Sequence, residues 1–129
     1  MVDSDIATMA IGQSIAVTPI QLITAFCAIA NDGILLKPHI LKSIKNANGT
    51  TYSETHTEEV RRTIDSASDK TLVGLLEQVV ASGGGGKASV RGYRIAGKTG
   101  TAQKVSEDGW GYLEGKYIAS FCGFAPVES

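Results

Sequence analysis

The sequence predicts an α+β fold in which helices pack on an incomplete antiparallel sheet. Two segments, residues 19–30 and 66–82, carry apolar side chains at helical spacing. Two β-like runs near the C-terminus, residues 93–102 and 117–122, are separated by a polar stretch, which is typical of an antiparallel pair. Because 129 residues leave room for one domain of ordinary size, these helices and strands are expected to share a single core.

The first helix has clear start and stop signals. Thr18 can cap it, Pro19 suits its first position, and Gln21 can complete a capping box. The apolar run that follows ends at Asn31-Asp32-Gly33. Because apolar residues cover nearly its whole circumference, we expect this helix to be buried on most sides.

A hairpin is expected between the two helices. Short β-like runs, residues 40–44 and 50–52, flank Asn46-Ala47-Asn48-Gly49, which favours an exposed turn. Asn48-Gly49-Thr50 also matches a glycosylation acceptor, but turn chemistry accounts for it in this place.

The second helix is expected to begin near Ser66, with Asp69 as the partner in a capping box. It ends at Ser82, before four glycines at 83–86 that predict a flexible loop. We therefore expect one domain with three parts: a helical part with the hairpin (1–82), a glycine-rich loop (83–86) and a strand pair (87–129). One helical face gathers the apolar side chains of Leu72, Leu75, Leu76, Val79 and Val80.

The two C-terminal runs differ in character. Residues 117–122 are apolar on both faces, as in a central strand. The polar stretch 106–115 before it is long enough to be a mobile loop. Within that loop, Trp110 and Tyr112 either shape the rim of a peptide cleft or simply pack.

Composition narrows the possible partners. Lys and Arg total 12 against 13 for Asp and Glu, a net charge of -1, so there is no basic surplus to favour nucleic acid. Cys27 and Cys122 show no ligand spacing and are expected to be small buried hydrophobes. His39 and His56 have no neighbour that suggests metal or general-base chemistry. We therefore expect no metal and no cofactor.

No targeting segment is visible in the sequence. Met1 is followed by Val-Asp-Ser-Asp, which does not resemble a signal peptide. The longest apolar-rich segment, residues 20–30, is shorter than the ~18 residues that a bilayer requires. The chain itself is expected to be soluble.

One segment matches the consensus sequence of a nucleotide-binding loop but lacks the structural context that such a loop requires. Residues 92–99 fit GxxxxGK[ST], which needs a strand before it, a bare loop within it and a helix starting at the lysine. Here a polyglycine loop precedes it and strand formers lie between the glycines. Nucleotide binding is therefore not expected.

Part of the same segment has side chains that would be useful on an edge strand of a sheet. There, Lys98-Thr99-Gly100-Thr101 offers an ammonium, hydroxyls and a residue without Cβ that lets a substrate backbone lie alongside. These groups are suited to the binding of a peptide.

Five segments resemble the transpeptidase domain of class B penicillin-binding proteins, with the division and sporulation members most similar. The resemblance is collinear and covers essentially the whole chain. It implies a partial penicillin-binding transpeptidase fold in a serine acyltransferase that cross-links peptidoglycan stem peptides and is acylated by β-lactams. It also implies a membrane-anchored parent on the extracytoplasmic face. The segments are residues 10–22, 28–33, 37–40, 96–103 and 116–126.

The family's chemistry uses three motifs, SxxK, SxN and KTG, and only the third occurs here. No serine of this chain has Lys three residues on or Asn two residues on. The resemblance therefore implies a C-terminal portion of a single transpeptidase domain, inactive alone.

The resemblance also assigns roles along the KTG segment. Lys98 would lie beside the SxN serine and organise proton transfer and the substrate carboxylate. The hydroxyls of Thr99 and Thr101 would hold that carboxylate, and the Thr101 N–H would form half of the oxyanion hole. Gly100 would stay small so that the substrate strand can approach, and Gln103 would have a structural or rim role.

Two other interpretations remain open from sequence. One is a β-lactam hydrolase or sensor of the same fold, although Gly12-Gln13 and residues 117–126 argue against it. The other is a non-catalytic binding or scaffold module, with residues 83–86 and 106–115 meeting a partner. Because residues 117–122 would keep one unpaired edge, we expect the isolated chain to self-associate.

Overall fold

The computed structural model describes residues 3–10, 12 and 15–128. In the described ranges the helices are α1 (Asp3–Ala10), α2 (Pro19–Ala30) and α3 (Ser66–Ala81), with the 3-10 turn η1 (Gly86–Ala88). The strands are β1 (Ile34–Leu36), β2 (Ser43–Lys45), β3 (Thr51–Glu54), β4 (Glu59–Arg62), β5 (Ala96–Val105) and β6 (Tyr112–Phe124). They form three antiparallel pairs, β1–β4, β2–β3 and β5–β6. The predicted α+β class is confirmed.

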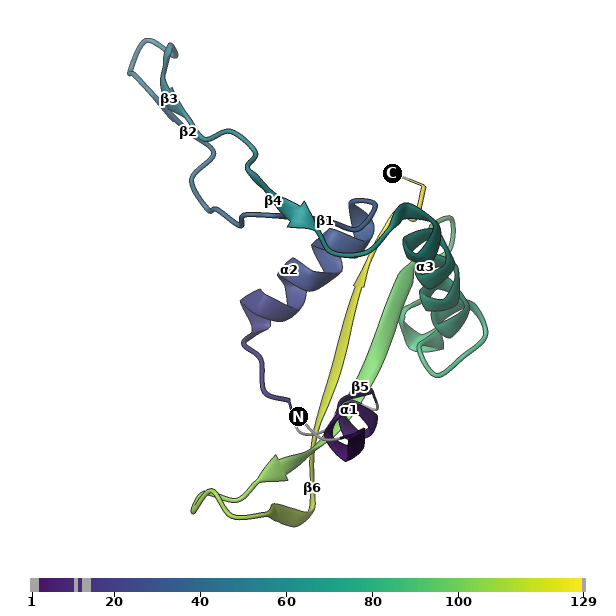
Figure 1. Cartoon of the computed structure of the whole chain (residues 1–129). Helices are drawn as coiled ribbons and strands as arrows, with labels where there is room; N and C mark the ends of the chain where they lie inside the picture. Colours follow the sequence, from purple (N-terminus) through teal and green to yellow (C-terminus); the bar gives the residue numbers. More distant parts are fainter. Residues whose placement is uncertain (1–2, 11, 13–14, 129) are drawn as a thin grey trace.

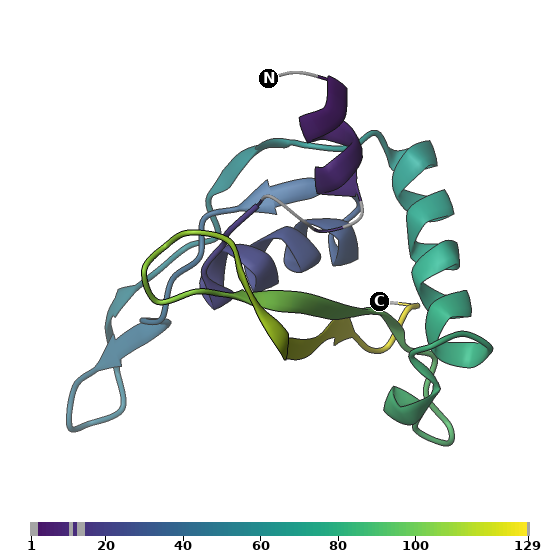
Figure 2. The same ribbon diagram turned by 90° about the horizontal axis from the view of Figure 1, so that it is seen from below.

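A long β5–β6 ribbon forms the centre of the molecule (Figure 1). Helix α2 contacts β6, and α3 contacts β5, so the two helices flank the ribbon. Figure 2 shows α2 lying along one side of this ribbon. The β2–β3 hairpin projects from the body as an arm, which confirms the predicted exposed hairpin.

Helix α2 begins as the sequence predicts. The Thr18 N–H donates to Oε1 of Gln21 at 2.8 Å, and the Gln21 N–H donates to Oγ1 of Thr18 at 3.3 Å. The helix ends before Gly33, whose φ of 76° is left-handed and where a Cβ would overlap the carbonyl oxygen of Ile64. Glycine is therefore required at this stop.

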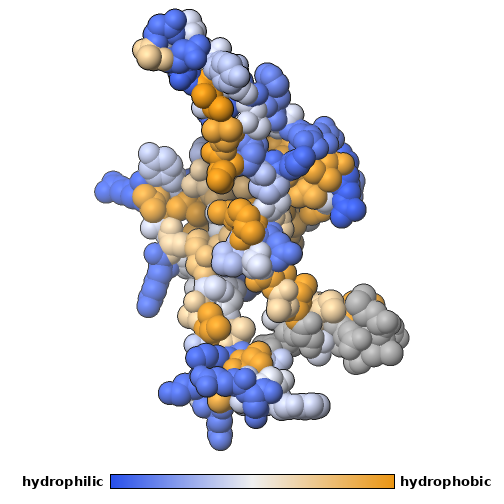
Figure 3. Space-filling view, turned by 90° about the vertical axis from the view of Figure 1, so that its left-hand side faces the viewer, coloured by the Kyte–Doolittle hydropathy of each residue, from blue (hydrophilic) through white to orange (hydrophobic). Residues whose placement is uncertain are grey.

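The expected burial of α2 is wrong for the described chain. Only Ala28 is buried on this helix, whereas Ile20 and Ile23 are more than half exposed. The reason is that β1, β6 and α3 contact α2 on part of its surface only. Apolar side chains are visible at the surface on this face of the molecule (Figure 3). The expected burial of Cys27 is wrong for the same reason, and Cys122 on β6 is half-buried.

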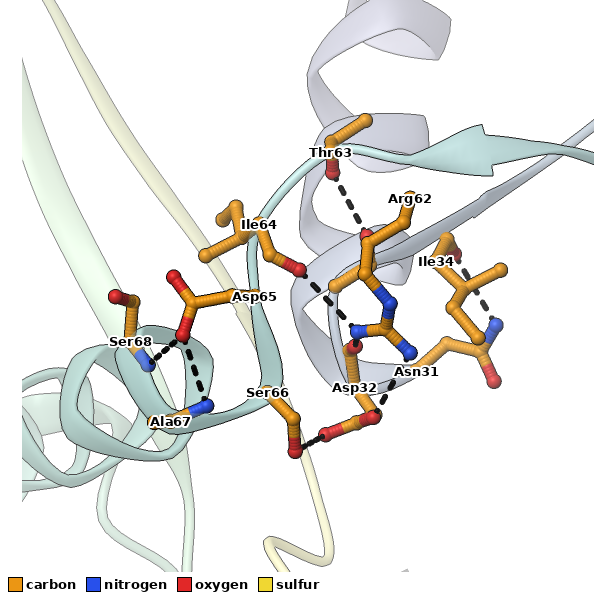
Figure 4. Close-up of polar contacts among 11 residues, drawn as sticks. Asn31, Asp32, Ile34, Arg62, Thr63, Ile64, Asp65, Ser66, Ala67 and Ser68 are labelled. Atoms are coloured by element: carbon orange, nitrogen blue, oxygen red, sulfur yellow. Dashed lines mark hydrogen bonds and ion pairs between the residues drawn. The ribbon is translucent and has the colours of Figure 1, made fainter.

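Helix α3 starts with a different cap from the one predicted. The Asp65 carboxylate accepts hydrogen bonds from the N–H groups of Ala67 at 3.1 Å and Ser68 at 3.0 Å (Figure 4). The proposed capping box of Ser66 with Asp69 is therefore wrong, because Asp65 satisfies these amides one residue earlier.

The rest of the described chain covers only part of the predicted apolar face of α3. Leu76 and Val80 are buried, but Leu75 is more than half exposed. The four glycines at 83–86 fold back on the end of the helix, where the Gly85 N–H donates to the Val79 carbonyl at 3.0 Å. They form a compact turn that leads into η1.

Both long strands have different bounds from those expected. Strand β5 begins at Ala96, so residues 93–95 precede it, and β6 begins at Tyr112. The predicted loop 106–115 is shorter because pairing resumes at Val105 and Tyr112 after a register shift. None of the helices in the described ranges is long and apolar enough to cross a membrane.

Candidate functional site

The KTG segment lies in the middle of β5, and its register with β6 defines two faces. Thr99 pairs with Phe121, Gly100 with Ser120, and Lys98 with Cys122. Residues directly opposite each other share a face, and successive residues alternate. Thr99, Thr101 and Gln103 therefore lie on one face, and Lys98 and Gly100 lie on the other.

The Lys98 face is turned toward α2 and the segment before it. Ala102 and Ser120 on this face line a hollow of about 690 Å³ together with Val17. Lys98 itself is exposed, and its ammonium donates to the carbonyl oxygen of Thr99 at 3.0 Å. The ammonium thus lies beside the strand backbone.

The opposite face carries the hydroxyls. Thr101 and Gln103 are exposed there, and their neighbour Tyr117 on β6 is 59% exposed. The alternation therefore places Thr99, Thr101 and Gln103 on one face of β5, although Gln103 also borders the hollow beside Ala102.

Two glycines let β5 and β6 pack closely beside the KTG segment. A Cβ at Gly97 would overlap Cζ of Phe121 and lie 3.0 Å from the carbonyl oxygen of Cys122. A Cβ at Gly123 would lie 2.5 Å from the carbonyl oxygen of Ala96. The Phe121 ring therefore occupies space that side chains at these glycines would need.

Gly100 has a neighbour that sequence reasoning missed. A Cβ at this position would lie 2.6 Å from Oγ of Ser120. A side chain at position 100 would therefore require the Ser120 hydroxyl to rotate away. Only the β5–β6 register, which no local sequence signal specifies, could have revealed this pair.

The glycine turn and an ion-pair clamp fix the start of β5. A Cβ at Gly84 would come within 4.0 Å of Oγ1 of Thr99, so the turn borders the hydroxyl face.

Arg94 donates to Glu77 from Nε at 2.5 Å and from Nη2 at 2.6 Å, and its Nη1 donates to Glu128 at 2.8 Å. These hydrogen bonds hold the pKa of Glu77 below its usual value.

Of the other candidate residues, only Tyr112 lies near this segment in the described chain. Trp110 is 86% exposed and does not pack, whereas Tyr112 lines the hollow beside Ala102. His39 and His56 are exposed. Across residues 3–10, 12 and 15–128, no three His, Cys, Asp or Glu side chains gather where they could hold a metal ion.

The rejected nucleotide motif has the wrong geometry for phosphate binding. Lys98 lies within a strand and does not start a helix, so no helix N-terminus faces a phosphate there.

A family model described as the penicillin-binding protein transpeptidase domain matches residues 2–129. The chain belongs to this family. Three residues of the similar segment 10–22 lie outside the described residues: Ile11, Gln13 and Ser14. Gln13 belongs to the Gly12-Gln13 pair that argues against a β-lactam hydrolase or sensor. The predicted family is confirmed.

Individual relatives agree with this assignment. Stage V sporulation protein D of Bacillus subtilis is 45% identical over 123 residues, which cover 95% of this chain and 19% of that protein. Peptidoglycan D,D-transpeptidase FtsI of Escherichia coli K12 is 38% identical over 126 residues, covering 97% of this chain and 19% of that protein. The chain thus spans about a fifth of the length of these relatives.

A solved transpeptidase structure has the same fold. Penicillin-binding protein 3 of Mycobacterium tuberculosis complexed with ampicillin superposes with a TM-score of 0.84 at 32% identity. The match covers 97% of this chain and 29% of that one. The partial penicillin-binding transpeptidase fold predicted for the chain is therefore confirmed.

Proposed function

We propose that this chain is the C-terminal portion of a serine D,D-transpeptidase domain that cross-links peptidoglycan stem peptides and binds β-lactams. The observation that carries the proposal is β5, where Lys98-Thr99-Gly100-Thr101 lies on a strand that pairs only with β6 within the described chain. Its other edge offers main-chain groups to an extended peptide. Membership of the transpeptidase family and the relatives named for this activity support it.

Each residue of the KTG segment takes a role that its position allows. Lys98, on one face, organises proton transfer with groups that approach from the α2 side. Thr99 and Thr101, on the other face, hold the substrate carboxylate, and Gln103 extends the same row as a rim contact. Gly100 keeps the strand free of a side chain between them.

The Thr101 N–H is proposed as one half of the oxyanion hole. A backbone donor of this kind needs no reorganisation when charge develops on the carbonyl oxygen, and losing one donor costs about 2.7–4 kcal/mol of transition-state stabilisation. Lys98 and Thr101 are therefore the catalytic residues of the proposal.

The nucleophile and its base lie outside these 129 residues, because the chain has neither SxxK nor SxN. We propose that the isolated chain is unreactive, and that the longer protein is membrane-anchored with this domain on the extracytoplasmic face. No cofactor is required for acyl transfer by an activated serine.

The test is β-lactam acylation by a longer protein that carries this chain together with SxxK and SxN. Lys98→Ala is expected to abolish most acylation with little change in melting temperature, because Lys98 is exposed and contributes little to the core. Lys104→Ala, an exposed lysine on the same strand, is the matched control and should acylate normally. If Lys98→Ala acylates like Lys104→Ala, the assignment of β5 is wrong.

A further inference from the structure

A second hollow, remote from the KTG segment, lies between α2, α3 and the C-terminal end of β6. Its volume is about 360 Å³, and none of residues 98–103 lines it. The wall combines apolar and charged side chains. Those that matter here are Val73, Phe124, Asp32, Glu77, Arg94 and Asp69.

Most charges around this hollow are already paired. Asp32 accepts a hydrogen bond from Oγ of Ser66 at 2.6 Å and from Nη2 of Arg62 at 3.2 Å (Figure 4). Arg94 is shared between Glu77 and Glu128. These side chains are therefore already engaged within the chain.

Two charged side chains that line the hollow, Lys70 and Asp69, take part in no ion pair among the described residues. Of these two, Asp69 is the buried one. It is only 3% exposed, and its Oδ1 has no hydrogen-bond partner within the part of the chain that the structure describes. Lys70, the next residue of α3, is exposed, and the described side chains include no ion pair between it and Asp69. A buried carboxylate oxygen without a partner is costly, so it indicates a group that this chain does not itself supply.

Its surroundings make this carboxylate a poor contributor to stability. Burial and the nearby charge of Asp32 raise the pKa of Asp69. A side chain that destabilises the folded chain is expected at a site that binds a ligand.

We propose that this hollow binds a guanidinium group from outside the chain, with the Asp69 carboxylate as its receptor. A guanidinium is planar and weakly hydrated, so it tolerates the apolar walls formed by Val73 and Phe124 better than a compact ammonium does. It also donates two parallel hydrogen bonds to one carboxylate. The chain already shows this pairing between Arg94 and Glu77 on the same wall.

The test is a titration of the full 129-residue chain with methylguanidinium chloride, followed by amide chemical shifts. Saturable shifts are expected at residues 69–74 and 32–33, which border the hollow. Asp69→Asn keeps the shape and removes the charge, and should weaken binding at least tenfold. Glu107→Gln, an exposed carboxylate in the β5–β6 turn, is the charge control and should bind like the parent chain.

Several results would overturn the proposal. The first is the absence of saturable shifts at these amides. The second is equal binding by Asp69→Asn, provided that circular dichroism shows that this variant is folded. The third is an equal response to methylammonium or sodium chloride at the same ionic strength, because this would reveal charge screening alone.

A second probe separates the two sources of a guanidinium. If the peptide Ac-Gly-Arg-Gly-NH₂ binds at least tenfold more tightly than methylguanidinium, the ligand is an arginine of a polypeptide. Equal affinities support a small free guanidinium compound. Both outcomes keep Asp69 as the receptor, and neither depends on transpeptidase activity, so failure here would leave the proposed function intact.

Discussion

Replacing Gly97 by Ala tests whether close packing of β5 on β6 stabilises the chain. The new Cβ would overlap Cζ of Phe121, lie 2.9 Å from its Cε2 and lie 3.0 Å from the carbonyl oxygen of Cys122. The ring can rotate, but the carbonyl belongs to the paired backbone and cannot move without disturbing the ladder. Overpacking of this kind typically costs about 1–3 kcal/mol.

The measurement is urea denaturation of the 129-residue chain. Gly97→Ala should lower the free energy of unfolding by about 1–3 kcal/mol, or the melting temperature by roughly 3–6 °C for each kcal/mol. Gly74→Ala is the matched control, because a Cβ there meets nothing within 4 Å. That helical position should gain about 0.5–1 kcal/mol.

The Phe121→Ala background separates the ring from the backbone. Without the ring, Gly97→Ala should cost less, and the remainder measures the contact with the Cys122 carbonyl. The packing explanation is refuted if Gly97→Ala leaves stability within about 0.5 kcal/mol, the range of an ordinary surface change, or if its cost is the same in both backgrounds.

Three further outcomes are expected. Intact-mass spectrometry after incubation with a fluorescent penicillin should show no adduct, and a stoichiometric adduct on any serine would contradict the absence of an activated nucleophile. Light scattering behind size exclusion should show self-association, because within the described residues β6 pairs only with β5; a monomer with residues 117–122 protected from hydrogen exchange would contradict this. Because the pKa of Asp69 is raised in the fold, its ionised form destabilises the chain at pH 7, and this loss is relieved as the pH falls through the raised pKa. Asp69→Asn should therefore be more stable than the parent at pH 7, with a difference that shrinks toward pH 4, and a gain independent of pH would refute the reasoning.

Local hydrogen-bonding signals in the sequence predicted the structure well where a single acceptor was available. The capping box of Thr18 with Gln21 formed as expected, and the Asn48 side chain accepts from the Thr50 N–H in the predicted turn. At α3 two adjacent acceptors, Asp65 and Ser66, compete for the same amides. Propensity does not decide between them, and Asp65 caps the helix while Ser66 binds Asp32.

Features that depend on distant pairing could not be predicted. Strand β1 pairs with β4, which follows it by more than twenty residues, and neither run is long enough to identify alone. In the candidate site, the sequence predicted that the KTG residues lie on a strand, which is β5, and the alternation of side chains implies its two faces. The proximity of Gly100 to Ser120 and of Gly97 to Phe121 could be found only from the register, which is continuous from Ala96 to Gln103.

The candidate site lies at the boundary between the anchored and the open halves of β5. Ala96 is fully buried, and Arg94 just before it is held by Glu77 and Glu128, so the strand enters the sheet from a fixed point. Thr101 and every residue after it on β5 are exposed. Functional groups are best held when a rigid element carries them out of a packed region. A change in the Arg94 clamp should therefore displace Lys98 and Thr101 together, although neither touches it. In the longer transpeptidase proposed above, such a change is expected to alter acylation through position alone.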